Sequence, residues 1–194
     1  MRRSEINRKS NETDIKCVLN LEGEGKANIK TDIPFLSHML DLFCRFALID
    51  LDLYASGDVE IDIHHLNEDT GIVLGQAIEK ALGDRIGISR IGYSYVPMDE
   101  ALSRVVIDFS GRPYFEFNLY VLGLENESDY TLEYAKQFLN AFSVHSKSNL
   151  HVDILRAVDF HHAVESVFKA LGRSVYEAKK KISDTIPSTK GRID

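Results

Sequence analysis

Two adjacent histidines followed by a glutamate, in the pattern His-His-x-x-Glu, occur twice in this chain, as His64–Glu68 and His161–Glu165. Each copy runs into apolar residues at the spacing of an amphipathic helix, so both copies are predicted to open a helix. The second copy follows the first by 97 residues, 161 minus 64, which is about half of the 194-residue chain. A repeat at that distance predicts a duplicated unit, with halves at about 1–86 and 87–194.

On a helix, the first histidine and the glutamate of each copy stand four residues apart on one face, with Cβ atoms about 5–6 Å apart. The histidine and the glutamate can therefore bind the same metal ion. The second histidines, His65 and His162, point about 100° away, which predicts that each motif serves two metal sites. Imidazole and carboxylate ligands suit divalent manganese, iron, zinc or nickel. A single His-x-x-x-Glu is usually a solvated pair, but two copies favour metal binding.

Charge and composition argue against several classes of protein. The net charge of −7, with signs interleaved along the chain, disfavours a nucleic-acid-binding surface, which needs a basic stripe. Cys17 and Cys44 lack the spacing of a disulfide framework or a zinc ribbon, which fits a reducing compartment. We find no run of eighteen apolar residues and no secretion signal, so we expect no membrane association and a cytoplasmic location.

The first half of the chain alternates between apolar and polar residues in the way that strands do. Residues 14–21 and 27–30 are predicted to pair as a hairpin around a glycine-rich break. Residues 34–43 begin with proline and continue with helical period, which predicts a helix. Residues 48–55 and 59–63 are predicted to form a second hairpin that delivers the first histidine pair. The predicted order of this half is therefore β-β-α-β-β-α.

The second half repeats this order with trimmed strands. Its predicted elements are strands at 101–109, 114–119 and 150–155 and helices at 132–144 and 161–181. The first two of these strands are predicted to pair as a hairpin, and the acidic stretch 125–129 is predicted to be a loop. Together the halves predict an α+β fold by internal duplication, in which each half is a sheet covered by helices.

Further metal ligands should be histidines that precede each doublet within its own half, namely His38 and His151. A metal held by two or three histidines and a carboxylate keeps positions open for a substrate. If they are not metal ligands, His38 is a histidine packed beneath a helix and His151 is a half-buried residue of a strand.

Basic and hydroxyl side chains near glycines form a candidate phosphate site. Arg90 follows Gly87, Arg112 lies in a Gly-Arg-Pro turn, and Ser188 and Lys190 lie in the polar tail. Arginine forks and hydroxyl groups beside a glycine suit a phosphate anion. Each group by itself is more often a solvated surface residue, so the prediction rests on their combination.

At these residues the sequence resembles the imidazoleglycerol-phosphate dehydratases, enzymes of histidine biosynthesis, over nearly the whole chain. The shared motifs are Asn11–Thr13, Phe35–Met39, Gly57–His65, Pro97–Leu102, Ser110–Pro113, His161–Glu165, Phe168–Ala170 and Pro187–Gly191. The resemblance implies a single dehydratase domain over residues 1–194, built from two duplicated α+β halves of the ribosomal protein S5 domain 2-like type. It also implies two manganese ions per active site and an octahedral 24-mer whose active sites lie at subunit contacts.

The resemblance assigns a role to each matching residue. The implied metal ligands are His38, His64, His65, Glu68, His151, His161, His162 and Glu165. The implied phosphate and substrate contacts are Arg90, Arg112, Lys169, Ser188 and Lys190. Glu12 matches a glutamate implicated in proton transfer, and Glu68 and Glu165 are expected to act in catalysis as well as in metal binding. The implied reaction removes water from imidazole-glycerol phosphate to give imidazole-acetol phosphate, with metal ions activating the substrate's ring.

Four residues depart from the family's pattern. Ser37 replaces the usual acidic or amide residue before His38, Leu42 stands where glutamine often occurs, and Phe46 stands where a histidine is common. Asp159 belongs to a pair that usually contains asparagine. The implied metal ligands are all retained, so we expect activity.

Two other functions fit the same residues. A binuclear metallohydrolase acting on a phosphorylated small molecule would use the metals to activate water and would release free phosphate. A metal-dependent assembly or storage protein would use the histidines only to join subunits. Imidazole-containing ligands would perturb the metal only where coordination positions are open, so they distinguish the dehydratase from the assembly protein.

Overall fold

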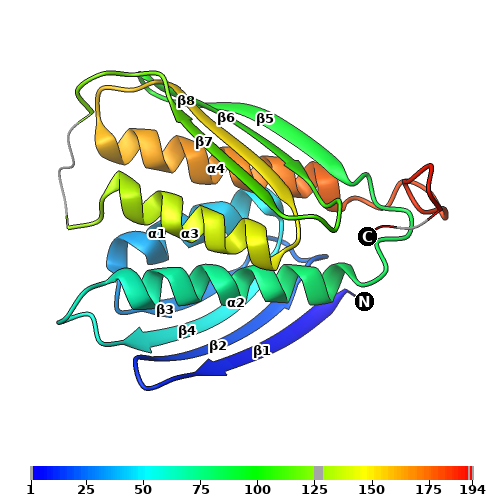
Figure 1. Ribbon diagram of the computed structural model, residues 1–194, viewed down its shortest axis with the longest axis horizontal. Helices are drawn as coiled ribbons and strands as arrows, with labels where there is room; N and C mark the ends of the chain where they lie inside the picture. The colour runs from blue at the N-terminus through cyan, green and yellow to red at the C-terminus, as the bar shows by residue number, and fades with distance from the viewer. Residues whose placement is uncertain (1, 125–128, 192, 194) are drawn as a thin grey trace.

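Among residues 2–124, 129–191 and 193, which the computed structural model describes, two four-stranded sheets form the outer layers and four helices lie between them (Figure 1). The strands are β1 Arg3–Lys9, β2 Thr13–Asn20, β3 Ala27–Thr31, β4 Asp50–Gly57, β5 Ile91–Met98, β6 Ala101–Asp108, β7 Tyr114–Leu119 and β8 Asn149–Arg156. The helices are α1 Pro34–Ala47, α2 His64–Leu82, α3 Leu132–His145 and α4 Phe160–Lys179. The predicted loop at 125–129 lies outside the described residues except for Asp129. None of the helices in the described part of the chain is both long and apolar enough to cross a membrane.

Both sheets have the same topology, with strand orders β1-β2-β4-β3 and β5-β6-β8-β7. In each sheet one pair of neighbours is parallel, β3 beside β4 and β7 beside β8. A parallel pair needs a crossover connection, and α1 and α3 provide it. Each half therefore follows the order β-β-β-α-β-α, and the predicted α+β fold of two duplicated halves is confirmed.

Two of the predicted hairpins are wrong, although their strands are right. The strands predicted at 14–21 and 27–30 do not pair with each other, because β4 lies between β2 and β3. In the same way β8 separates β6 from β7, so the hairpin predicted over 101–119 does not form. Turn residues mark where a strand ends, but they do not indicate which strand will lie beside it.

The sequence patterns miss β1 and β5, which are edge strands of the two sheets. β1 is rich in charged residues and fully buries Ser4 alone. β5 contains Gly92 and Pro97, residues that weaken a strand signal and that edge strands tolerate. Because an edge strand buries only a narrow face, the apolar alternation on which a strand prediction depends is weak in both.

The strand predicted at 59–63 is wrong, because the chain forms a turn there. Ile61 donates its N–H to the carbonyl oxygen of Asp58 at 2.9 Å, which closes the turn. The alternating apolar residues of this segment do not all face the core, since Ile61 is 73% exposed. The turn leads from the end of β4 directly into α2.

All four helices begin at the same end of the molecule, on the left in Figure 1. Pro34 occupies the first turn of α1, as predicted, where its missing N–H has no partner to lose. Asp159 caps α4 by accepting the N–H of His162 at 2.7 Å. Asp62 accepts the N–H of His64 at 2.7 Å at the start of α2. Both predicted histidine helices are therefore confirmed, and a carboxylate fixes where each begins.

The duplication extends to the packing between the halves, because α2 packs on α3 and α4 packs on α1. A Cβ atom at Gly75 of α2 would lie 2.7 Å from the carbonyl oxygen of Phe142, and one at Gly172 of α4 would lie 2.7 Å from that of Phe43. A Cβ atom does not fit at that distance, so each crossing requires glycine. The two crossings tie the halves into one core, in which the rings of Phe43 and Phe142 lie 6.3 Å apart.

Candidate metal centre and anion pocket

His38, His161 and Glu165 come together at the end of the molecule where the helices begin, and they form what we call the α4 cluster. Nε2 of His161 and Nε2 of His38 lie 3.1 Å and 3.3 Å from the same oxygen, Oε2 of Glu165. One ligand atom from each residue lies within 4.8 Å of the others. The Glu165 side chain is 9% exposed, whereas the two imidazoles are about half exposed. This arrangement can hold a divalent metal and leave positions open toward solvent.

Lys169, one turn after Glu165 on α4, contacts the same carboxylate. Its Nζ lies 2.5 Å from Oε1 of Glu165 and 3.2 Å from the sulfur of Met98. Burial raises the pKa of Glu165, but the hydrogen bond and charge of Lys169, together with the two imidazoles, lower it below its ordinary value overall. Glu165 is therefore ionised at neutral pH, as a metal ligand must be. Lys169, predicted as a substrate contact, lies at this cluster and apart from the other predicted phosphate contacts.

His64 and Glu68 occupy the equivalent place on α2 and form the α2 cluster. Nε2 of His64 lies 3.3 Å from Oε2 of Glu68, and its Nδ1 lies 2.8 Å from Oε1 of Gln137 on α3. The side chains of His64 and Glu68 are 38% and 48% exposed. They line a cavity of about 340 Å3 together with Glu12 and Arg8. The α2 cluster offers one imidazole and one carboxylate to a metal, fewer ligands than the α4 cluster.

The second histidine of each pair faces away from the first. The planes of the two adjacent rings differ by 80° on α2 and by 87° on α4. Nδ1 of His65 lies 3.2 Å from both carboxylate oxygens of Asp58. Nδ1 of His162 lies 2.9 Å from Oε2 of Glu100, in the turn between β5 and β6. An imidazole whose Nδ1 faces a carboxylate has its Nε2 left to bind a metal, an arrangement common among metal-binding histidines.

These carboxylates also set the protonation of the outward histidines. The hydrogen bond with Asp58 raises the pKa of His65 above its ordinary value of 6.5, and the hydrogen bond with Glu100 does the same for His162. Hydrogen bonds from the backbone N–H of Asp159 and from His162 lower the pKa of Glu100 to about 2. The two outward histidines are therefore more basic than a free imidazole.

His151 lies apart from both clusters. It is exposed on the outer face of the second sheet, and its ring lies 5.4 Å from that of Tyr114. From His151, β8 continues for about 17 Å toward the start of α4. Within one chain, the structure therefore does not bring this predicted ligand to His161 or Glu165.

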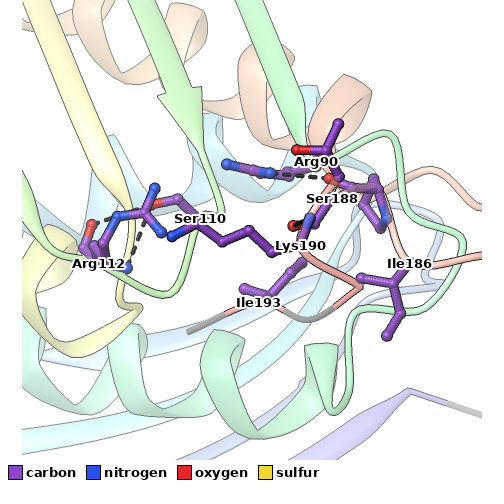
Figure 2. Close-up of a pocket in the computed structure, with 9 residues that line it drawn as sticks. Arg90, Ser110, Arg112, Ile186, Ser188, Lys190 and Ile193 are labelled. Carbon is purple, nitrogen blue, oxygen red and sulfur yellow. Dashed lines mark hydrogen bonds between the residues drawn. The ribbon is translucent and has the colours of Figure 1, made fainter.

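A cavity of about 560 Å3 at the opposite end of the molecule brings together most of the predicted phosphate contacts (Figure 2). It is lined by Arg90, Ser110, Arg112, Ile186, Pro187, Ser188, Thr189, Lys190 and Ile193. The turn after β6 supplies Ser110 and Arg112, and the C-terminal tail supplies another wall. Three basic side chains and three hydroxyl groups line this space, which is chemistry that suits an anion. We call this cavity the anion pocket.

Arg90 is held from two sides at the edge of the anion pocket. Its Nε and Nη2 donate to the two carboxylate oxygens of Asp108 at 2.7 Å and 2.9 Å. Its Nη1 donates to the carbonyl oxygen of Pro187 at 2.9 Å. Arg90 therefore joins β6 to the C-terminal tail as well as lining the pocket.

The α4 cluster and the anion pocket lie at opposite ends of α4. His161 is in its first turn, while the N–H of Arg90 donates to the carbonyl oxygen of Ala178 in its last turn. The rise from His161 to Ala178 is about 25 Å. Figure 1 shows the same separation, with α4 starting on the left and the C-terminal tail on the right. A small molecule cannot contact both sites of the same chain.

The structure adds polar groups that the sequence patterns miss. Gln137, Asp58 and Asp108 each contact a predicted site residue from another element, and Arg8 lines the cavity at the α2 cluster. These contacts join residues that are distant in sequence or lie in turns. They therefore leave no repeated spacing that a sequence pattern would reveal.

Comparison with known protein families and sequences gives a consistent result. The family model described as imidazoleglycerol-phosphate dehydratase matches residues 31–175. An imidazoleglycerol-phosphate dehydratase of Ralstonia pickettii is 48% identical over 195 residues, which cover 99% of each chain. One of Polynucleobacter necessarius is 47% identical over 196 residues, which cover 100% of each chain.

Solved structures of imidazoleglycerol-phosphate dehydratases share this fold. The structure from Staphylococcus aureus has a TM-score of 0.81 and 32% identity, and the match covers 92% of this chain and 99% of that chain. The structure from Pyrococcus furiosus, in complex with (S)-C348, has a TM-score of 0.83 and 33% identity, and the match covers 96% and 99%. The similarity therefore spans both duplicated halves.

Proposed function

The chain belongs to the imidazoleglycerol-phosphate dehydratase family, and from this premise we propose how its own residues remove water from imidazoleglycerol phosphate. The reaction is an elimination in histidine biosynthesis. A hydroxyl group and a carbon-bound proton leave as water, and the resulting enol becomes imidazole-acetol phosphate. The observation that carries our assignment of the site is the α4 cluster, in which three ligand atoms converge within 4.8 Å.

We assign divalent manganese to the α4 cluster and a second ion to the α2 cluster. The donor set supports the first assignment, because two imidazole nitrogens and an ionised carboxylate suit a divalent ion of this kind. In the α2 cluster, His64 and Glu68 form the same i,i+4 pair, and Gln137 orients the ring of His64. When bound, such a metal supplies Lewis acidity to the substrate's imidazole ring.

Glu12 is the residue that we assign to proton transfer. Its carboxylate lines the cavity at the α2 cluster and lies 3.9 Å from Nδ1 of His65. The side chain is 55% exposed, so it can exchange a proton with solvent. Glu165 does not suit this role, because its contact with Lys169 stabilises the ionised carboxylate and so opposes the uptake of a proton. We therefore assign Glu165, like its counterpart on α2, to metal binding.

The anion pocket is the site that we assign to the substrate's phosphate. Arg112 and Lys190 bring positive charge, and Ser110 and Ser188 bring hydroxyl groups. Each hydrogen bond to an ionised group is worth about 1.5–3 kcal/mol. Arg112→Ala should therefore lower kcat/KM by about tenfold to a hundredfold. An unchanged kcat/KM in both Arg112→Ala and Lys190→Ala would remove these residues from the site.

We propose that each active site is shared between copies of the chain, within the 24-mer expected of this family. A three-carbon chain and an ester oxygen join the substrate's ring to its phosphate, a span of less than about 10 Å. The α4 cluster and the anion pocket of one chain are about 25 Å apart along α4. A second copy would complete the site by placing its anion pocket and His151 against the clusters of the first.

Co-expression of two inactive variants tests this sharing. His161→Ala damages the α4 cluster, and the double variant Arg112→Ala with Lys190→Ala damages the anion pocket. In mixed particles, sites that combine an intact cluster from one copy with an intact pocket from another regain activity, about one quarter of sites for random mixing. A mixed particle no more active than its parents would mean that one chain holds a complete site.

Turnover by the purified chain is the direct test of the reaction. With manganese and imidazoleglycerol phosphate, we expect imidazole-acetol phosphate to form without release of inorganic phosphate. Release of phosphate would instead favour a metallohydrolase. Bound metal that imidazole-containing ligands do not perturb, without turnover, would favour an assembly or storage protein.

We also propose a cytoplasmic location for this biosynthetic enzyme. Cys17 and Cys44 are both free and buried, which fits a reducing compartment. Fractionation of cells followed by immunodetection would test the location, and recovery outside the cytoplasm would count against it.

A further inference from the structure

We propose that Asp108 is a positioning residue for the phosphate site, because it fixes Arg90 and, through Arg90, the C-terminal tail. The proposal rests on the function proposed above, since it concerns the pocket assigned to the substrate's phosphate. Asp108 is the last residue of β6 and does not line the pocket itself. Asp108 can therefore position a bound phosphate only through other residues.

The contact between Asp108 and Arg90 is made by two parallel hydrogen bonds. Nε of Arg90 lies 2.7 Å from Oδ1 of Asp108, and Nη2 lies 2.9 Å from Oδ2. The side chain of Asp108 is only 23% exposed and that of Arg90 only 19% exposed. A two-bond pair of this kind fixes the plane of the guanidinium group as well as its position. Asp108 therefore determines how Arg90 is oriented.

The orientation of Arg90 in turn fixes the tail. Nη1 of Arg90 donates to the carbonyl oxygen of Pro187 at 2.9 Å, at the beginning of the segment that carries Ser188 and Lys190 (Figure 2). This segment belongs to no helix or strand, and the N–H groups of Ser188 and Gly191 donate to carbonyl oxygens only two and three residues earlier, those of Ile186 and Ser188. A hydrogen bond from the folded body to Pro187 therefore restricts where Ser188 and Lys190 lie.

Arg90 can serve as this anchor because its own backbone is fixed on both sides. Its N–H donates to the carbonyl oxygen of Ala178 at 2.8 Å, and its carbonyl oxygen accepts the N–H of Phe109 at 3.0 Å. Its φ of 71° lies in the left-handed region, which a non-glycine residue adopts only when its surroundings hold it there. Asp108 thus orients the side chain of a residue whose main chain is already held by α4 and by Phe109, the residue after β6.

The charge of Asp108 separates a positioning role from a purely electrostatic one. A carboxylate near an anion pocket repels phosphate, so neutralising it should tighten phosphate binding if charge were its only effect. If Asp108 positions Arg90 and the tail, Asp108→Asn should weaken binding instead. The amide keeps one acceptor oxygen but turns an NH2 group toward the guanidinium. The two roles therefore predict changes of opposite sign.

The experiment compares Asp108→Asn with the wild type in the full-length, metal-loaded protein. We expect the dissociation constant of inorganic phosphate, measured by calorimetry, and the KM of the substrate to rise about tenfold, with kcat within about threefold of the wild type. Amide hydrogen exchange of the tail, residues 184–191, should become faster. Metal content and particle size should not change.

Glu22→Gln is a matched control. Arg2 donates from Nε to Glu22 at 3.0 Å and from Nη1 to the carbonyl oxygen of Lys179 at 2.7 Å, so it repeats the carboxylate, arginine and carbonyl arrangement away from the pocket. This variant should leave phosphate binding unchanged. An equal loss of phosphate binding in Glu22→Gln would attribute the effect to general loosening and would overturn the proposal.

Unchanged or tighter phosphate binding in Asp108→Asn would also overturn the proposal that Asp108 positions Arg90 and the tail. If that variant does not fold, Asp108→Glu keeps the charge but moves the carboxylate by one methylene. Weaker phosphate binding in Asp108→Glu would support positioning, and unchanged binding would refute it. Phosphate binding and hydrogen exchange are measured without turnover. A wild type that lacks dehydratase activity would therefore count against the proposed function alone.

Discussion

The α4 cluster and the α2 cluster start from the same five-residue motif but differ in what surrounds the carboxylate. The Glu165 side chain is 9% exposed and pairs with Lys169 one turn later on α4. The Glu68 side chain is 48% exposed, and the residue one turn later on α2 is Ile72. One carboxylate is therefore buried, charged and paired with a cation, while the other faces solvent beside an apolar side chain.

The helix that crosses each motif accounts for a second difference. α1 brings His38 to the α4 cluster as a third side chain that can ligate a metal, whereas α3 brings Gln137 to the α2 cluster as a hydrogen-bond partner of His64. The duplication has kept the pair within each motif, because that pair depends only on helical spacing. It has not kept the partner from the crossing helix. One chain thus presents one cluster with three converging side chains that can ligate a metal and one cluster with two.

Removal of the first histidine of each motif should have the largest effect. We expect His161→Ala and His64→Ala each to lower kcat by at least about a hundredfold and to reduce bound metal, because each removes an imidazole that we assign to metal binding. Metal analysis by atomic spectroscopy and steady-state kinetics measure both. His145→Ala is the control, since this histidine at the end of α3 belongs to neither cluster. If one variant kept full metal content and full turnover, the cluster that contains the substituted histidine would not be part of the active site.

The contact between Lys169 and Glu165 predicts an unequal effect on stability. In the metal-free protein, Lys169→Met leaves a buried carboxylate without its cation and should cost about 3 kcal/mol of unfolding free energy. Ile72→Met, at the corresponding place on α2, keeps a similar volume and should cost less than about 1.5 kcal/mol. Chemical denaturation of both variants measures the difference. An equal loss of unfolding free energy in the two variants would show that Glu165 does not depend on a cation more than Glu68 does.

The helix crossings test where the two halves are equivalent. Gly75→Ala and Gly172→Ala would each place a Cβ atom 2.7 Å from a carbonyl oxygen of the facing helix. We expect each substitution to cost about 1–3 kcal/mol of unfolding free energy, because the helices must move apart. Thermal or chemical unfolding of the two variants under the same conditions is the measurement. A cost at one glycine and none at the other would show that the crossings are not equivalent.

The outward histidines should show the smallest effect. Asp58 and Glu100 raise the pKa of His65 and His162, so both should titrate above 6.5 in the metal-free protein. Their protonation therefore stabilises the fold fully below about pH 6.5, and this contribution is lost as the pH rises through the folded-state pKa. Glu100→Gln should lower the midpoint of His162 in an NMR titration and leave that of His65 unchanged. Midpoints at or below 6.5 in the wild type would contradict this prediction.

Features that depend on neighbours within a few residues can be predicted from the sequence of this protein alone. The helical period after each histidine pair predicts α2 and α4, and Pro34 marks the start of α1. The i,i+4 spacing places His161 and Glu165 on one face, because four residues make just over one helical turn. The repeat of the motif at half the chain length predicts the duplication. Each of these signals is local or periodic, so a single sequence contains it.

Which of these elements lie against one another depends on the packing of the whole chain. Local spacing does not indicate that β4 lies between β2 and β3, or that α1 brings His38 to Glu165 across 127 residues of sequence. It also does not indicate that the anion pocket and the α4 cluster lie at opposite ends of α4. Strand order and helix crossing are selected by the burial of the whole core, and a local window of sequence does not contain the segments that compete for it.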